Sequence, residues 1–308
     1  MHPSPRRTVG ALAALLVLAL ATACGSSARP NPQPTATGVT YPVTVGSVTL
    51  DHQPQRIVSL SPVMTEMLFA VGAGDQVVAV DSQSNYPADA PVTDLSAYTP
   101  NAEAVATYTP DLVVLSDDIS DIVGQLTALH IPVYVGKAAD TTDDTYRELA
   151  EIGTLTGHPG DASALVERMK DDLAKILQDV PARSKPLTYF YELDNTFYTA
   201  TSESFIGRLF TAAGLVNIAD AGNAGNGYPQ ISQETILAAN PDLIFLADAY
   251  PGGESAQTVA ARPGWANLKA VRTGQVVELD TDIASRWGPR IVDLQRAIVD
   301  AIVAVPSS

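Results

Sequence analysis

The feature of this sequence that most limits its possible folds is a segment that occurs twice. "EAVATYTPDLVVLSD" begins at Glu103, and "ETILAANPDLIFLAD" begins at Glu234. Pro110 and Asp111 recur at the same offset, as Pro241 and Asp242. Each copy reads as a helix that a proline ends, followed by a short buried strand. The match indicates an internal duplication, although single βα units of this kind also resemble one another by chance.

The rest of the chain continues this alternation of apolar strands with helical stretches. In the first half, "RIVSLS", "QVVAVD" and "VYVG" read as strands around helices such as "PVMTEMLFAVGAG". In the second half, "LTYFYELD" and "QVVELD" read as strands and "SFIGRLFTAAG" as a helix. This alternation is typical of an α/β fold. The sequence therefore predicts two similar α/β-sandwich lobes, residues 48–160 and 182–308.

One long helix is predicted to join the lobes, over residues 161–181. Asp161 can serve as the N-cap, apolar residues recur at helical spacing as far as Val180, and Pro181 ends the pattern. Twenty helical residues span about 30 Å, which is enough to cross from one lobe to the other. A single stiff connection predicts limited lobe movement around a ligand cleft between the lobes.

The N-terminus reads as an export signal. Residues 1–23 contain Arg6 and Arg7 followed by the apolar run "VGALAALLVLALATA", which is short for a membrane span. The following "ATAC" resembles a bacterial lipobox and implies a lipid on Cys24. Residues 24–47 then read as a flexible tether. We expect an extracytoplasmic protein anchored to the cell membrane; secretion with an unmodified thiol is the alternative.

Composition and motifs argue against several classes of function. The formal charge of −16 disfavours nucleic acid, because phosphates would be repelled. Beyond the export signal the histidines are His52, His130 and His158, in no metal-binding spacing. Phosphate-binding glycine loops and a "GXSXG" motif are absent. We predict no catalytic residues, no metal site and no cofactor, while a scattered catalytic triad, a bare-metal carrier and an adhesion protein remain as alternatives.

The loops after the predicted strands contain aromatic rings, an acid and an arginine. Flat rings suit a large, partly apolar ligand, which the charged groups would orient. Ligands of open α/β sheets lie beyond the carboxyl ends of the strands, so we expect these residues to line the cleft. Core packing is the alternative for each ring taken singly. The candidates are Tyr86, Tyr98, Phe197, Tyr198, Tyr228, Asp282, Arg286 and Trp287.

Three stretches carry a resemblance to a known family. "PQRIVSLSPVMTEMLFAVGAGDQVVAVDSQSNYP", "NPDLIFLAD" and "RWGPRIVDLQRAI" resemble the substrate-binding proteins of ABC importers for vitamin B12 and ferric siderophores. The likeness covers about residues 48–305 and is nearest to the vitamin B12-binding proteins. It implies two lobes bridged by one helix and a chelate ligand that is delivered to a permease dimer. We expect the protein to be a monomer. Corrinoid is the first expectation, with ferric siderophore or haem as the alternative.

The resemblance also implies roles for individual residues. Tyr86 matches a ligand-contacting tyrosine, and Tyr98 and Tyr228 match other ligand-contacting rings. Glu103 and Glu234 match surface glutamates that pair with permease arginines, one on each lobe. Two equivalent acids suit a two-fold symmetric partner. The alternative is that each glutamate only favours the dipole of the helix it begins.

Overall fold

The computed structural model describes residues 38–222, 225 and 227–306. The predicted export signal, Cys24 and most of the predicted tether lie outside the described residues. Within the described ranges, no helix combines the length and apolar character that a membrane crossing needs.

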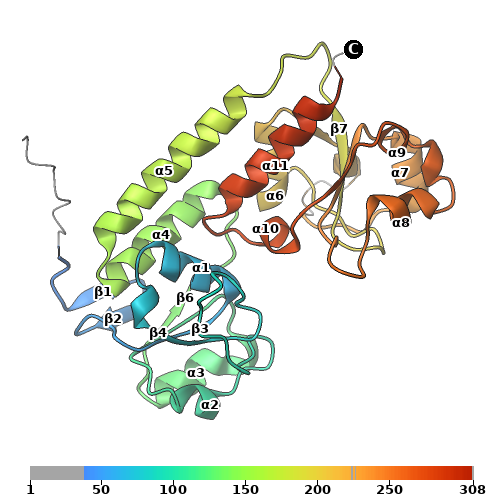
Figure 1. Ribbon diagram of the computed structural model, residues 1–308. Coiled ribbons are helices and arrows are strands. Elements are labelled where there is room, and N and C mark those ends of the chain that lie inside the picture. The colour runs from blue at the N-terminus through green and yellow to red at the C-terminus, as the bar shows by residue number, and fades with distance from the viewer. Residues whose placement is uncertain (1–37, 223–224, 226, 307–308) are drawn as a thin grey trace, which may run out of the picture. The chain divides into compact units, whose positions relative to one another are not determined.

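Two four-stranded parallel sheets form the framework of the fold (Figure 1). The first has the order β4-β3-β5-β6, where β3 is Ile57–Leu60, β4 Val77–Val80, β5 Leu112–Leu115 and β6 Val133–Val135. The second has the order β8-β7-β9-β10, where β7 is Thr188–Glu192, β8 Val216–Asn217, β9 Leu243–Leu246 and β10 Val276–Glu278. Strands in corresponding positions of the chain take the same place in each sheet. The predicted pair of similar α/β lobes is confirmed.

Helices cover both faces of each sheet. In the first lobe they are α1 Pro62–Ala70, α2 Ala102–Ala106, α3 Ile122–Ala128 and α4 Thr142–Thr156. In the second they are α6 Phe205–Ala212, α7 Gln233–Ala239, α8 Ala256–Ala261, α9 Lys269–Arg272, α10 Thr281–Ser285 and α11 Ile291–Ala304. Short 3₁₀ turns lie at Gly74–Gln76, Ile119–Asp121, Ile218–Asp220 and Trp265–Asn267. Successive side chains of β5 and β9 enter apolar clusters on opposite faces, so these strands are continuously hydrophobic.

The repeated aspartate has the same structural role in both lobes. The carboxylate of Asp111 accepts hydrogen bonds from the backbone N–H groups of Gln55 and Arg56 at 2.8 and 2.9 Å, just before β3. The carboxylate of Asp242 accepts one from the N–H of Thr188 at 2.8 Å, at the start of β7. Each aspartate therefore joins the start of one strand to the start of its neighbour, which explains why the Pro-Asp pair occurs twice.

A β-hairpin replaces the end of the predicted tether. Strands β1 Val43–Val45 and β2 Val48–Leu50 pair around Gly46, whose φ of 57° is the left-handed conformation that glycine tolerates best. Val43, Val48 and Leu50 are buried, because these apolar side chains pack against the first lobe. The described fold thus includes a strand before residue 48, where the first lobe was predicted to begin.

The long helix expected between the lobes is α5, Pro159–Gln178. It begins at Pro159 rather than after Asp161, because proline suits the first helical position, and Asp161 lies in the first turn. Helix α5 packs against α4 of the first lobe and against α11 of the second. The sequence did not separate α4 from the connection that follows it.

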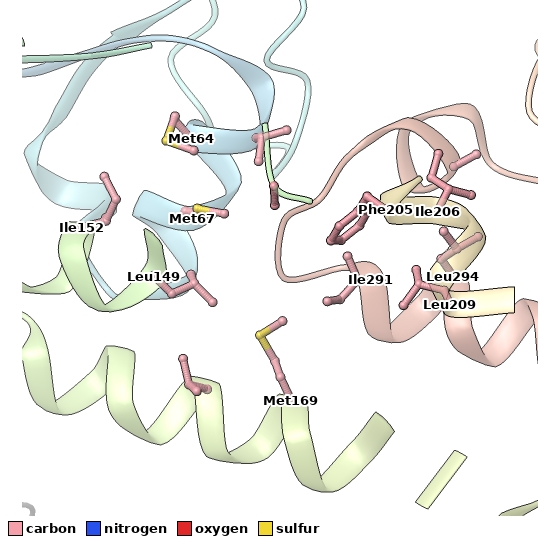
Figure 2. Packing of buried hydrophobic residues seen from close by; sticks show 14 of the residues in the cluster. Met64, Met67, Leu149, Ile152, Met169, Phe205, Ile206, Leu209, Ile291 and Leu294 are labelled. Atoms are coloured by element: carbon pink, nitrogen blue, oxygen red, sulfur yellow. The ribbon is translucent and has the colours of Figure 1, made fainter. Parts of the chain in front are cut away.

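One apolar core runs from the first lobe through the bridging helices into the second (Figure 2). Met64 of α1 and Leu149 of α4 lie on one side, Met169 of α5 lies between, and Phe205 and Ile291 belong to the second lobe. Both sheets are part of a single compact unit of the chain. Opening the lobes widely would expose this shared core to water, so the structure favours small movements.

Candidate functional site

A cavity of about 380 Å³ lies at the carboxyl ends of strands β3 and β5. One wall is made by the first lobe, from the end of β3, the first turn of α1 and the residues that follow β5. The opposite wall comes from α10 and the two residues after it. The site therefore combines segments from both halves of the duplicated chain, where ligands of open α/β sheets are expected.

The first turn of α1 brings hydroxyl groups to the cavity. Ser61 is the N-cap, and its Oγ accepts a hydrogen bond from the N–H of Met64 at 3.3 Å. The Ser61 Oγ also lies 2.7 Å from the Oγ of Ser116, which follows β5. Pro62 occupies the first helical position and has no N–H. Sequence reasoning did not single out these serines.

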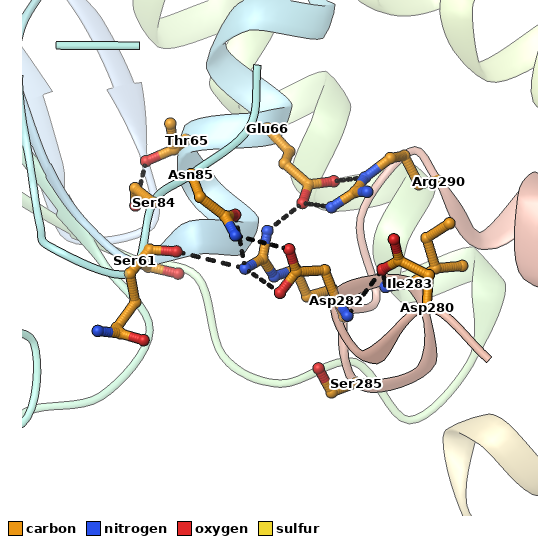
Figure 3. Close-up of polar contacts among 12 residues, drawn as sticks. Ser61, Thr65, Glu66, Ser84, Asn85, Asp280, Asp282, Ile283, Ser285 and Arg290 are labelled. Carbon is orange, nitrogen blue, oxygen red and sulfur yellow. Dashed lines mark hydrogen bonds and ion pairs between the residues drawn. The ribbon is translucent and has the colours of Figure 1, made fainter. Parts of the chain in front are cut away.

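Four charged side chains form a network beside the cavity and join the two lobes (Figure 3). Glu66 of α1 is only 2% exposed, and its carboxylate binds Arg286 at 2.7 Å and Arg290 at 2.6 Å. Arg286 also binds Asp282 at 2.7 Å. Asn85 donates to Asp282 at 2.8 Å and accepts from Arg286 at 3.0 Å. Each charge is thus compensated by a neighbour, as burial requires.

The arginine that the sequence predicted to contact a ligand, Arg286, therefore already binds other side chains of the protein. Arg286 lines the cavity, but its side chain is only 9% exposed and its guanidinium binds two carboxylates. Asp282 lines the cavity as well. The sequence identified both residues but not their buried partner Glu66, which lies in an apolar helix far away in the chain.

Two predicted rings line the cavity, and a third lies next to the charged network. Tyr98 is 75% exposed and contributes to the cavity wall. Trp287 lines the opposite wall, and its indole Nε1 donates to Glu148 at 3.1 Å. Tyr86 does not line the cavity; the guanidinium of Arg290 lies over its ring, 4.2 Å from the centroid. Arg290, which Glu66 holds, thus fixes the position of Tyr86.

Burial makes Glu148 a weaker acid than an exposed glutamate. The side chain is 3% exposed, and desolvation raises its pKa to about 7, although the hydrogen bond from Trp287 opposes the shift. A carboxyl group behind the cavity wall therefore changes its charge near neutral pH.

The remaining three predicted rings lie in the second lobe and outside the lining of this cavity. Phe197 stacks on Trp265, with centroids 5.7 Å apart, and packs against the outer core of that lobe. This is the core-packing alternative, and it separates Phe197 from the cavity. Tyr198 and Tyr228 are 43% and 49% exposed. They stay candidates for contact with a ligand larger than the cavity.

The cavity also contains groups that sequence reasoning missed, of which Asp117 matters most. Asp117 follows β5, is exposed, and has no ion pair or hydrogen bond with the described residues. It corresponds to Asp248 after β9, the last residue of the repeated segment. The duplication could have identified it, since the last letters of both copies mark the carboxyl ends of equivalent strands.

The two repeated glutamates occupy equivalent surface positions. Glu103 lies in the first turn of α2 and Glu234 in the first turn of α7, and both are exposed. Hydrogen bonds from the start of α7 lower the pKa of Glu234. The helix dipole thus accounts for an acid here, and docking of a partner stays a prediction.

Among the described residues, no group of three or more His, Cys, Asp or Glu side chains is placed to hold a metal ion. The cavity instead offers hydroxyl, amide and carboxylate groups beside aromatic rings. Such a lining suits binding of an organic molecule or of a metal already enclosed by one.

Comparisons with known proteins agree with this geometry. A family model described as periplasmic binding protein matches residues 57–283. An uncharacterized ABC transporter substrate-binding lipoprotein of Bacillus subtilis is 30% identical, over 96% of this chain and 98% of its own. A cobalamin-binding protein of Halobacterium salinarum is 33% identical, over 95% of this chain and 84% of its own. The crystal structure of a possible iron-binding (periplasmic solute-binding) protein of Staphylococcus epidermidis matches with a TM-score of 0.71 and 27% identity, over 82% of this chain and 99% of that one.

Proposed function

This chain belongs to the periplasmic binding protein family, and we propose that it captures a metal chelate of the corrinoid type outside the cytoplasm for an ABC importer. The observation that carries the proposal is the cavity at the strand ends, where Tyr98 and Trp287 face a site built from both halves of the chain. The cobalamin-binding relative from Halobacterium salinarum supports the choice of ligand.

The proposed protein binds and releases its ligand without chemistry and has no cofactor of its own. Release requires a state of lower affinity, which the permease would favour by contacting both lobes. The network of Glu66, Arg286 and Arg290 spans the lobes next to the ligand site. A small displacement of α11 against α1 would disturb the network and the cavity wall together, so the ligand could leave without wide opening.

Membrane attachment and docking complete the proposal. A lipid on Cys24 would keep the protein near its transporter and raise its effective concentration there. The Bacillus subtilis relative, whose name describes a lipoprotein, supports this assignment. We further propose that the protein acts as a monomer, and that Glu103 and Glu234 bind the two equivalent subunits of a permease dimer.

Fluorescence titration tests the ligand assignment. Trp287 lines the cavity, whereas Trp265 is fully buried in the second lobe, so a ligand should quench mainly Trp287. We expect saturable quenching by cobalamin and by cobinamide. The Trp287→Phe variant and free tryptophan correct for light that the ligand absorbs. If calorimetry and fluorescence detect no binding of either corrinoid, the corrinoid assignment fails.

A ferric siderophore or haem is the second candidate. The structural similarity to a possible iron-binding protein of Staphylococcus epidermidis favours it. Titration with ferric hydroxamates, ferric catecholates and haem in the same assay separates the candidates. Binding of one of these, with no binding of corrinoids, would assign the chain to iron uptake.

A further inference from the structure

The positive charges near the cavity are already neutralised. Arg286 is the only basic residue among the described residues that line it, and Glu66 and Asp282 bind its guanidinium at 2.7 Å each. Arg290 lies behind it and is held by the same Glu66 carboxylate through two of its nitrogens, at 2.9 and 2.6 Å. An anionic ligand could recruit either arginine only by displacing a carboxylate from a buried ion pair, which is costly.

The helix end at the cavity offers little further attraction for an anion. Pro62 has no N–H, the N–H of Met64 is bound by the Ser61 hydroxyl, and the N–H of Thr65 is bound by the Ser61 carbonyl. The first turn of α1 therefore uses most of its donors internally, and the site lacks the row of free N–H groups that binds phosphates and carboxylates at other helix ends.

The cavity wall instead carries excess negative charge. Glu66 and Asp282 balance the two arginines, so the exposed carboxylate of Asp117 is uncompensated. The amide of Gln83 and the Ser61–Ser116 hydroxyl pair also line the wall and can either accept or donate hydrogen bonds. The carboxylate of Asp117 can only accept them, so it is the group that discriminates. This arrangement suits a ligand surface that presents N–H groups and repels one that presents carboxylates.

From these contacts we infer that the cavity selects a neutral or cationic chelate with N–H donors over a chelate whose rim bears carboxylates. The inference rests on the proposed function and names the chemical class of its ligand. The rim of a corrinoid carries primary amides, whose N–H groups can donate to Asp117. Haem carries two propionates, and ferric catecholates carry negative charge. Asp117 is the residue that sets this preference.

A matched pair of ligands tests the inference on the corrinoid ring. Cobalamin is compared with a cobalamin in which one peripheral propionamide has been hydrolysed to the carboxylate. Ring, metal and size are unchanged. We expect the carboxylate to bind at least about tenfold more weakly at low salt, and the difference to narrow as salt screens the repulsion. Equal affinity of the two, or tighter binding of the carboxylate, would overturn the inference.

Protein variants assign the effect to one residue. Asp117 is exposed and has no side-chain hydrogen bond or ion pair within the described part of the chain. Asp117→Asn should therefore leave the fold intact and reduce the discrimination at least threefold. Asp300→Asn is the control, because Asp300 is exposed on α11 and does not line the cavity. It removes the same net charge and should leave the discrimination unchanged. An equal effect of both variants would show that overall charge, not Asp117, causes the preference.

A second ligand pair tests the charge preference without a corrinoid. It therefore separates failure of this inference from failure of the corrinoid assignment. Ferrioxamine B carries a free ammonium group, which succinylation converts to a carboxylate. If the protein binds iron hydroxamates instead of corrinoids, the ammonium form should bind more tightly, again at least about tenfold. No preference between the two iron chelates would overturn the charge selectivity while leaving the transport role. Absence of binding to all four chelates would overturn the proposed function and the inference with it.

Discussion

Arg286 shows how folding changes the role expected of a single side chain. An arginine in a loop after a strand suggests a free cation for a ligand, yet its guanidinium binds Glu66 and Asp282. Glu66 lies in α1 among apolar neighbours, where a carboxylate would be costly to bury alone. The arginines make its burial possible. Because they bind Glu66, they are no longer free to bind a ligand. Arg286 thus holds the cavity wall in place.

Glu148 provides a prediction of pH dependence. Its pKa is about 7 in the folded protein and close to 4.5 when unfolded. The folded state therefore binds the proton more tightly between these values, and the free energy of unfolding should fall as pH rises through this window, by at most about 1.4 kcal/mol per pH unit. The cost of ionising the buried Glu148 carboxyl is absent below about pH 4.5 and complete above about pH 7. Urea denaturation between pH 5 and 8 measures it.

Comparison of variants isolates this contribution. The Glu148→Gln side chain cannot ionise. The free energy of unfolding of this variant, relative to that of the unmodified protein, should therefore increase as pH rises from 5 to 7.5. Glu167→Gln is the control, because Glu167 is exposed on α5 and its side chain is 70% accessible. Stability curves for the Glu148 variant and the unmodified protein that run parallel across this range would contradict the assigned pKa.

Helices α4 and α5 meet at a glycine, and this contact sets how the bridge joins the first lobe. A Cβ on Gly153 of α4 would lie 2.4 Å from the Cβ of Ala162 and 3.0 Å from the carbonyl oxygen of His158. Both neighbours belong to the start of α5 or its cap. The helices can approach this closely only because residue 153 has no side chain.

Gly153→Ala should therefore push α5 away from α4. We expect a loss of about 1–3 kcal/mol in the free energy of unfolding, the usual cost of overpacking. Gly160→Ala is the matched control within α5, because a Cβ there meets nothing within 4 Å. It should be neutral or stabilise slightly, since alanine favours helix more than glycine does. Chemical denaturation compares the two, and a Gly153 variant as stable as the control would refute the close contact.

Across the molecule, the duplicated architecture places equivalent helices on both lobes. Glu103 and Glu234 lie in the first turns of α2 and α7, and both side chains are exposed. The shared apolar core restrains the lobes, so the spacing of the two acids should vary little. A nearly fixed spacing suits a partner with two equivalent basic sites.

Charge reversal tests this docking role. Glu103→Lys combined with Glu234→Lys should abolish ligand uptake by cells that contain the cognate permease, while fluorescence titration shows unchanged ligand affinity. Each single change should cause a partial loss. A double variant with lysine at Glu167 and Asp300 alters the net charge equally at exposed positions outside α2 and α7, and should transport normally. Normal uptake by the Glu103 and Glu234 variant would leave only the helix-dipole role for these acids.

Local sequence patterns determined the elements and their order. The alternation of apolar strands with helices predicted the α/β lobes, and the repeated Pro-Asp segment predicted that they would be alike. Prediction was less accurate where the signals were short. The first strand of the hairpin, Val43–Val45, was assigned to the tether, because it has only three residues. The start of α5 differed because Pro159 and Asp161 are competing start signals two residues apart.

Which distant side chains meet was decided by packing. Periodicity along the chain is a local property, so it indicates which face of a strand or helix is buried but not what lies against it. Tyr98, Asp282 and Trp287 meet in one cavity, whereas Phe197 stacks on Trp265 in the second lobe, although all had the same loop signature. Glu66 meets Arg286 only because the sheets and helices of both lobes fold around one continuous core. Such contacts depend on the sum of many weak interactions between remote segments, which no short stretch of sequence contains.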